Sequence, residues 1–283
     1  MFRLSGTAFA ALVISSSVTL HAGIIDSAGL LTVTSGNGLR SYTFTGALQQ
    51  TLAITGVPPT GTAQGVSVIN NHIFTSFVST NGSFTPKIAE INPVTGAVLS
   101  LLNTATPQIT ALGDDGTNLL LLDSVNTWDV YTYATGGAFV SKVAIDRNSP
   151  FNFQMDGIDG DGQSLFVSTA QVHQPIVTNT TAGVFLSQFD TNMEQLSSYI
   201  GGLAHDPSDD TLWVAGNSEF RHFSRSGTLL SVANTGEGNT SVTGLEVIPA
   251  SVPEPSTFIL AVFGLSFVVW RRRWPNCLDQ ASA

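Results

Sequence analysis

Three acidic side chains and one imidazole stand at related positions of this sequence, each within two residues of a recurring apolar residue. They are Asp114, Asp159, His205 and Glu246. If the fold brings these positions together, the carboxylates and the imidazole could bind a cation or a sugar. The alternative is that the four side chains are only hydrated at the mouth of a channel. Both interpretations remain open from the sequence.

A second acidic segment runs from Asp159 to Gln163 and briefly resembles a calcium loop. An EF-hand loop also needs a bidentate glutamate at its twelfth position, which here is Ala170. Because Asp and Gly are favoured in tight turns, the segment is predicted to be a turn between two strands. We therefore predict no metal and no cofactor. The sequence also lacks a His-x-x-x-His pair, a nucleophile elbow and a phosphate loop, so we assign no catalytic residue.

The elements that would position these residues come from a repeat of about 45 residues. Its marker is a small residue followed by an apolar one, at Gly65-Val66, Ala111-Leu112, Gly157-Ile158, Gly202-Leu203 and Gly244-Leu245. Polar turns and short apolar or alternating strands follow the marker. Four short antiparallel strands in 40–50 residues are typical of one β-propeller blade. The sequence therefore predicts an all-β fold.

The first and last units of the repeat are incomplete, and together they contain the four strands of one blade. The first unit, Ile24 to about Gly56, supplies three strands and lacks the innermost one, whereas the last unit, Val242 to Pro249, supplies a single strand. Together they predict a β-propeller of five four-stranded blades, closed by strands from both termini so that no sheet edge is left open. A β-sandwich pair or a solenoid is the alternative. Since innermost strands line a propeller's channel, the four ionisable residues would converge near the axis.

The pattern is similar to quinoprotein-like or streptogramin-lyase-like propellers, and that similarity concerns the fold only.

The composition limits the classes of molecule that the protein could bind. Charged residues make up 11% of the 283 residues and the net charge is −10, which argues against nucleic acid and anionic membrane surfaces. The one cysteine, Cys277, lies near the C-terminal end, so the body forms no disulfide.

The N-terminal residues 1–22 are predicted to be a signal peptide. Arg3 precedes an apolar stretch from Ala8 to Val18, and Ala22 is a small residue at the expected cleavage site. The alternative is a buried N-terminal helix or strand.

The C-terminal segment 251–273 has three features in order. Pro253, Glu254 and Pro255 come first, an uncharged stretch from Thr257 to Trp270 follows, and Arg271, Arg272 and Arg273 close it. The apolar stretch is predicted to form a hydrophobic helix about 20 Å long, shorter than the roughly 30 Å hydrocarbon core of a bilayer. The arginines would stay on the cytoplasmic side. We expect a transient membrane insertion, and an ordinary tail anchor is the alternative.

This order of features resembles the PEP-CTERM sorting signal. The resemblance implies that the six residues just named carry sorting and processing by an exosortase, a membrane transpeptidase-like enzyme. It also implies a Gram-negative host that makes exopolysaccharide and biofilm, with export through the inner membrane. The tail at 274–283 departs from the family, which usually stops at the basic cluster.

We therefore expect a signal peptide at 1–22, a propeller at 23–250, a sorting signal at 251–273 and a short tail at 274–283. The expected function is that of an exported, non-enzymatic structural or binding protein of the envelope or extracellular matrix. Exopolysaccharide is a candidate partner. The alternative is a secreted lyase or hydrolase acting on polysaccharide at the channel mouth. Whether Asp159, His205 and Glu246 lie within a few ångströms of one another discriminates between the two.

Overall fold

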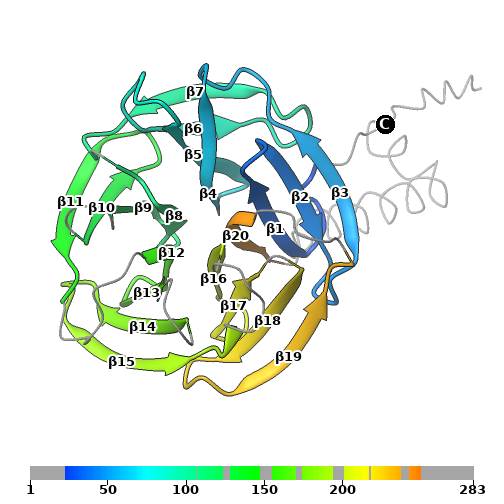
Figure 1. Cartoon of the computed structure of the whole chain (residues 1–283), viewed down its shortest axis with the longest axis vertical. Coiled ribbons are helices and arrows are strands. Elements are labelled where there is room, and N and C mark those ends of the chain that lie inside the picture. Colours follow the sequence, from blue (N-terminus) through cyan, green and yellow to red (C-terminus); the bar gives the residue numbers. More distant parts are fainter. Residues whose placement is uncertain are drawn as a thin grey trace, which may run out of the picture.

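The computed structural model describes residues 23–106, 108–123, 128–146, 155–169, 174–193, 201–216, 218–236 and 242–249. These residues form five four-stranded antiparallel sheets arranged around a central axis (Figure 1). The fold is a five-bladed β-propeller, which confirms the architecture predicted from the repeat. The described residues include no helix long and apolar enough to cross a membrane. The predicted signal peptide and the helix from Thr257 to Trp270 lie outside them.

Each blade runs from an innermost strand at the axis to an outermost strand at the rim. The closing blade contains β20 (Val242–Ile248), β1 (Gly29–Thr34), β2 (Gly38–Tyr42) and β3 (Leu48–Ala53). The second contains β4 (Gly61–Ile69), β5 (His72–Ser79), β6 (Lys87–Ile91) and β7 (Val98–Asn103). The third contains β8 (Ala111–Asp114), β9 (Asn118–Asp123), β10 (Asp129–Ala134) and β11 (Phe139–Ala144). The fourth contains β12 (Met155–Gly160), β13 (Ser164–Thr169), β14 (Pro175–Thr180) and β15 (Phe185–Asp190). The fifth contains β16 (Gly202–Asp206), β17 (Thr211–Ala215), β18 (Glu219–Ser224) and β19 (Leu229–Asn234).

The ring is closed by pairing the last described strand with the first. β20 runs antiparallel to β1, with Leu245 opposite Thr32 and Val247 opposite Leu30. Figure 1 shows β20 in orange beside β1 in blue, at the centre of the ring. Closure by both termini is therefore confirmed. The pairing with β20 gives hydrogen-bond partners to the backbone groups on the inner edge of β1, which would otherwise be unpaired.

The small residue of the sequence repeat marks the closest approach of neighbouring innermost strands. A Cβ atom at Gly65 would lie 2.3 Å from the backbone nitrogen of Leu112, and one at Gly202 would lie 2.5 Å from that of Leu245. One at Gly244 would lie 2.6 Å from the Cα atom of Gly65. Five inner strands can meet around one axis only because these positions carry almost no side chain.

The hydrophobic core lies between adjacent blades. Leu30 and Tyr42 of the closing blade pack with Trp213 and Phe220 of the fifth blade, and the Tyr42 and Phe220 rings meet edge to face with centroids 5.1 Å apart. The middle strands are buried on both faces and therefore carry continuous apolar runs. The outermost strands have one exposed face, as at Leu99 on β7, which is 55% exposed. The packing of this core holds the five innermost strands in a ring around the axis.

Candidate functional site

Three carboxyl groups from three different blades converge inside the ring of innermost strands. Asp114 ends β8, Asp159 lies on β12 and Glu246 lies on β20. Each offers an oxygen within 4.8 Å of the others. The three residues, called the axial triad below, are only 8%, 3% and 6% exposed, respectively. The structure therefore brings together the three acidic residues singled out in the sequence and largely buries their side chains.

Neutral donors from the surrounding strands hold two members of the triad. Asp159 accepts the backbone N–H groups of Asp114 (3.0 Å) and His205 (2.5 Å), one on each oxygen. Asp114 accepts the Ser67 hydroxyl (2.7 Å) and the Gly116 N–H group (2.7 Å). These bonds orient the two carboxyl groups but bring no positive charge to them.

Glu246 has fewer partners. Its Oε1 accepts the N–H group of Val247 at 2.9 Å. No described residue donates a hydrogen bond to its buried Oε2. An unsatisfied buried oxygen normally costs about 1–3 kcal/mol, and more when the group is charged. The Glu246 carboxyl group shares a side-chain hydrogen bond with Asp114, which requires a proton on one of the two groups. When both groups are ionised, Glu246 Oε2 has no partner among the described residues.

Burial and mutual repulsion act on the triad together. Burial raises the pKa of Asp114, and burial followed by repulsion from the neighbouring carboxylates raises the pKa of Asp159 and of Glu246 well above the usual value. Two full charges 4.8 Å apart repel by about 3.5 kcal/mol at an effective dielectric constant of about 20. Three such pairs reach about 10 kcal/mol, comparable with the whole stability of a domain, about 5–15 kcal/mol. The triad must therefore hold protons or a cation.

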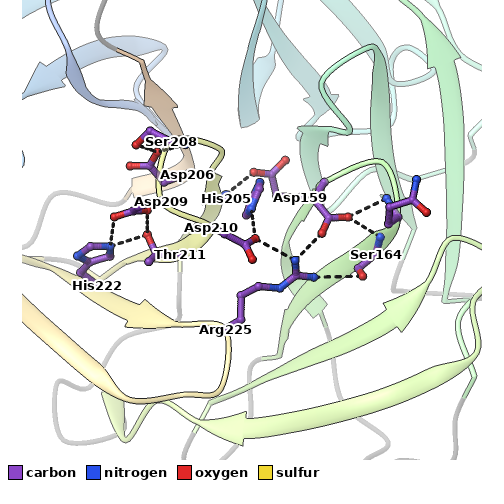
Figure 2. A network of polar contacts seen from close by, with 12 residues as sticks. Asp159, Ser164, His205, Asp206, Ser208, Asp209, Asp210, Thr211, His222 and Arg225 are labelled. Atoms are coloured by element: carbon purple, nitrogen blue, oxygen red, sulfur yellow. Dashed lines mark hydrogen bonds and ion pairs between the residues drawn. The ribbon is translucent and has the colours of Figure 1, made fainter.

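His205 is near the triad but does not complete it through its ring. Its backbone N–H group binds Asp159, whereas its Nε2 atom lies 3.0 Å from Asp210 Oδ1 (Figure 2). The ring stacks on Phe166 with centroids 5.5 Å apart. His205 therefore reaches Asp159 through its backbone N–H group, whereas Asp210 and Phe166 hold its ring.

A pocket of about 190 Å³ opens onto the triad. Its lining includes all three carboxyl groups together with Val68, Pro207, Val247 and Pro249. All four residues predicted for the channel mouth line this pocket. It is smaller than the 300–1,000 Å³ clefts that usually hold organic ligands. It has room for an ion and a few water molecules.

The acidic segment from Asp159 to Gln163 forms the turn between β12 and β13. Asp161 Oδ1 accepts the N–H groups of Gln163 (2.7 Å) and Ser164 (2.5 Å). Arg225 Nη1 lies 2.8 Å from Asp161 Oδ2. The same atom lies 2.9 Å from Asp210 Oδ1 (Figure 2). Although burial opposes it, these donors and Arg225 lower the pKa of Asp161. Sequence reasoning missed Arg225, although the scarcity of cations, 10 Lys and Arg in the chain, is a signal that could have drawn attention to it.

His222 belongs to a separate polar group on the fifth blade. Its ring lies flat on Trp213, with centroids 4.2 Å apart, and its Nε2 atom is 2.6 Å from Thr211 Oγ1. Burial lowers the pKa of His222, against the opposing effect of the carboxylates of Asp209 and Asp206. This arrangement is a packed aromatic pair, and His222 is not among the residues that line the axial pocket.

Comparisons with known proteins address the sorting segment and the fold. The PEP-CTERM protein-sorting motif matches residues 251–273. A search of curated proteins gives no match. Among solved structures, the chain resembles a chain of the nidogen/laminin complex at 11% identity and a TM-score of 0.53, covering 80% of this chain and 100% of that chain. It also resembles a protein of unknown function from Bacteroides caccae (13% identity, TM-score 0.47, covering 77% and 85%). BamB from Moraxella catarrhalis is a more distant likeness (14% identity, TM-score 0.37, covering 73% and 58%).

At these identities the structural likeness concerns the fold alone. The sorting motif carries more specific information, because it marks a bacterial protein that is exported and processed by an exosortase. The chain thus carries a PEP-CTERM protein-sorting motif after a five-bladed β-propeller, and it is an exported bacterial envelope protein.

Proposed function

We propose that the protein is a non-enzymatic structural or binding component of the cell envelope or extracellular matrix of a Gram-negative bacterium. The observation that carries this proposal is the sorting motif at 251–273 directly after a closed, rigid propeller. The C-terminal segment would insert transiently in the inner membrane until an exosortase releases the body. Exopolysaccharide of the same matrix is the proposed neighbour of the mature protein.

The geometry of the axis supports binding or scaffolding over polysaccharide cleavage. Glycoside hydrolysis needs two carboxyl groups that flank a bound sugar linkage. Here the carboxyl groups of Asp114, Asp159 and Glu246 are at most 8% exposed, and the pocket of about 190 Å³ is too small for a sugar chain. The imidazole of His205 is held by Asp210 and is not placed as a general base beside the triad.

The sorting part of the proposal is tested by replacing Pro253, Glu254 and Pro255 with alanine in the native host. The wild-type protein is expected in the extracellular or outer envelope fraction without residues 271–273. The triple variant is expected to stay membrane-associated and unprocessed. Pro275→Ala, a proline substitution beyond the arginines, is the matched control and should be processed normally. Normal release of the triple variant would contradict the proposed sorting role.

The non-enzymatic part is tested by incubating the purified protein with exopolysaccharide from the same host. Co-sedimentation with the polymer at unchanged polymer mass is expected. A fall in polymer mass, or the release of reducing or unsaturated ends, would contradict the proposal and favour the polysaccharide-acting enzyme.

A further inference from the structure

Two groups of acidic side chains lie beside the axis, and they differ in how their charge is balanced. In the first group, Arg225 bridges Asp161 and Asp210, and the His205 ring lies beside Asp210. The axial triad has no comparable partner, because no Lys, Arg or His side chain forms an ion pair with it in the described part of the chain. Three buried carboxyl groups thus face one another with only neutral donors around them.

The second observation concerns Glu246. Its side chain is more than nine-tenths buried, lies with the other two carboxyl groups, and leaves Oε2 without a donor. A structural glutamate at this depth would be expected to have its oxygens satisfied. When the three groups are ionised, the shared proton of Asp114 and Glu246 is gone, and the partner that Oε2 then lacks belongs where the three carboxyl groups meet.

We propose that the axial triad of Asp114, Asp159 and Glu246 binds one divalent cation, and that Ca²⁺ is the preferred ion. The donor set consists of oxygens only, since the His205 ring is held by Asp210, and hard cations prefer such sets. Ca²⁺ takes six to eight oxygen ligands in a flexible geometry. Each carboxylate oxygen that accepts one hydrogen bond still has a lone pair for a metal. The pocket leaves room for water molecules to complete the shell.

The site would also join the blades. Its ligands come from the third, fourth and closing blades, and its supporting donors, Ser67 and the His205 N–H group, come from the second and fifth. An ion at this point would be connected to every innermost strand, to three of them through its ligands and to two through the donors that hold those ligands. Its binding is therefore expected to stabilise the folded propeller.

The test uses the full chain purified in mild detergent. Elemental analysis of the protein as purified comes first, followed by stripping with EDTA and calorimetric titration with Ca²⁺, and with Mg²⁺ and Zn²⁺ in separate arms. We expect one Ca²⁺ per chain, bound more tightly than Zn²⁺. At a free Ca²⁺ concentration 100 times the Kd, the melting temperature should rise by about 5–10 °C.

Glu246→Gln is the decisive variant, because it keeps the shape of the side chain and removes one of three charges. It should weaken Ca²⁺ binding by about 100-fold or more and abolish the Ca²⁺-dependent rise in melting temperature. Asp114→Asn is a second variant with the same expectation. Asp210→Asn is the matched control: it lies in the neighbouring group that Arg225 neutralises and should leave Ca²⁺ binding within about twofold of wild type.

Three outcomes would overturn the proposal. The first is absence of Ca²⁺ both in the purified protein and in titration, which would mean that the triad holds only shared protons. The second is tighter binding of Zn²⁺ than of Ca²⁺, which would contradict the proposed preference of the site for Ca²⁺. The third is unchanged Ca²⁺ affinity in folded Glu246→Gln and Asp114→Asn, which would place the ion elsewhere.

Discussion

The Leu245→Ala substitution tests whether the propeller depends on its closing strand. Leu245 is 1% exposed and packs with Leu30, Trp213 and Phe220 across the seam between the closing and fifth blades. Truncating a buried leucine to alanine costs about 2–5 kcal/mol. For a domain of about 150–250 residues, each kcal/mol lowers the melting temperature by about 2–4 °C. We therefore expect a fall of about 4–20 °C.

Leu99→Ala is the matched control for this measurement. Leu99 lies on the outermost strand β7 and is 55% exposed, so its removal should change the stability by no more than about 0.5 kcal/mol. Both variants and the wild type are melted under identical conditions and followed by circular dichroism in the far ultraviolet. Equal melting temperatures for Leu245→Ala and the wild type would refute the assignment of β20 to the core.

Truncation extends the same test. A chain that ends after Gly236 loses four buried aliphatic side chains, Val242, Leu245, Val247 and Ile248. At about 1.5–3 kcal/mol each, the loss is about 6–12 kcal/mol. This equals most of the stability of a typical domain, so the truncated chain should be unfolded or aggregated. A chain that ends after Ser251 keeps β20 and should melt like the full-length body.

Three further predictions concern the axis, the pH dependence and the ends of the chain. Gly202→Ala places a Cβ atom against a neighbouring inner strand and should destabilise the protein by about 1–3 kcal/mol in denaturant unfolding, whereas Gly136→Ala, with no atom within 4 Å of the new Cβ, should be nearly neutral. Because the pKa of His222 is lowered in the folded state, the unfolded state takes up the proton first, so stability should fall as the pH drops below about 7, and His222→Gln should make that fall shallower. A pH profile of wild type no steeper than that of the variant would contradict this assignment. Intact-mass analysis of the protein from its native host should detect neither Met1 nor Arg271–Arg273, and finding either on the mature species would reject processing at that end.

Most of the fold could be predicted from the sequence, because each blade repeats one pattern of apolar and turn residues. The spacing of pairs such as Gly202-Leu203 predicts the blades. The reason for the glycine is the close approach of the neighbouring innermost strand, which only the structure shows. Convergence of Asp114, Asp159 and Glu246 was likewise predictable, since innermost strands must meet at the axis. The stacking of His205 on Phe166 and the ion pair between Arg225 and Asp161 were not, because these contacts join the fourth and fifth blades and leave no local pattern.

The order of the strands also has a consequence for the timing of export. The innermost strand of the closing blade is β20, which is the last of the propeller's strands to be made and exported and lies just before the sorting motif. A chain that crosses the membrane with its N-terminus first therefore cannot close its ring until Val242–Ile248 has crossed. Pairing strands so distant in sequence is slow, because a long loop must close first. In a chain exported in this order, the ring therefore stays open until β20 has crossed and can pair with β1.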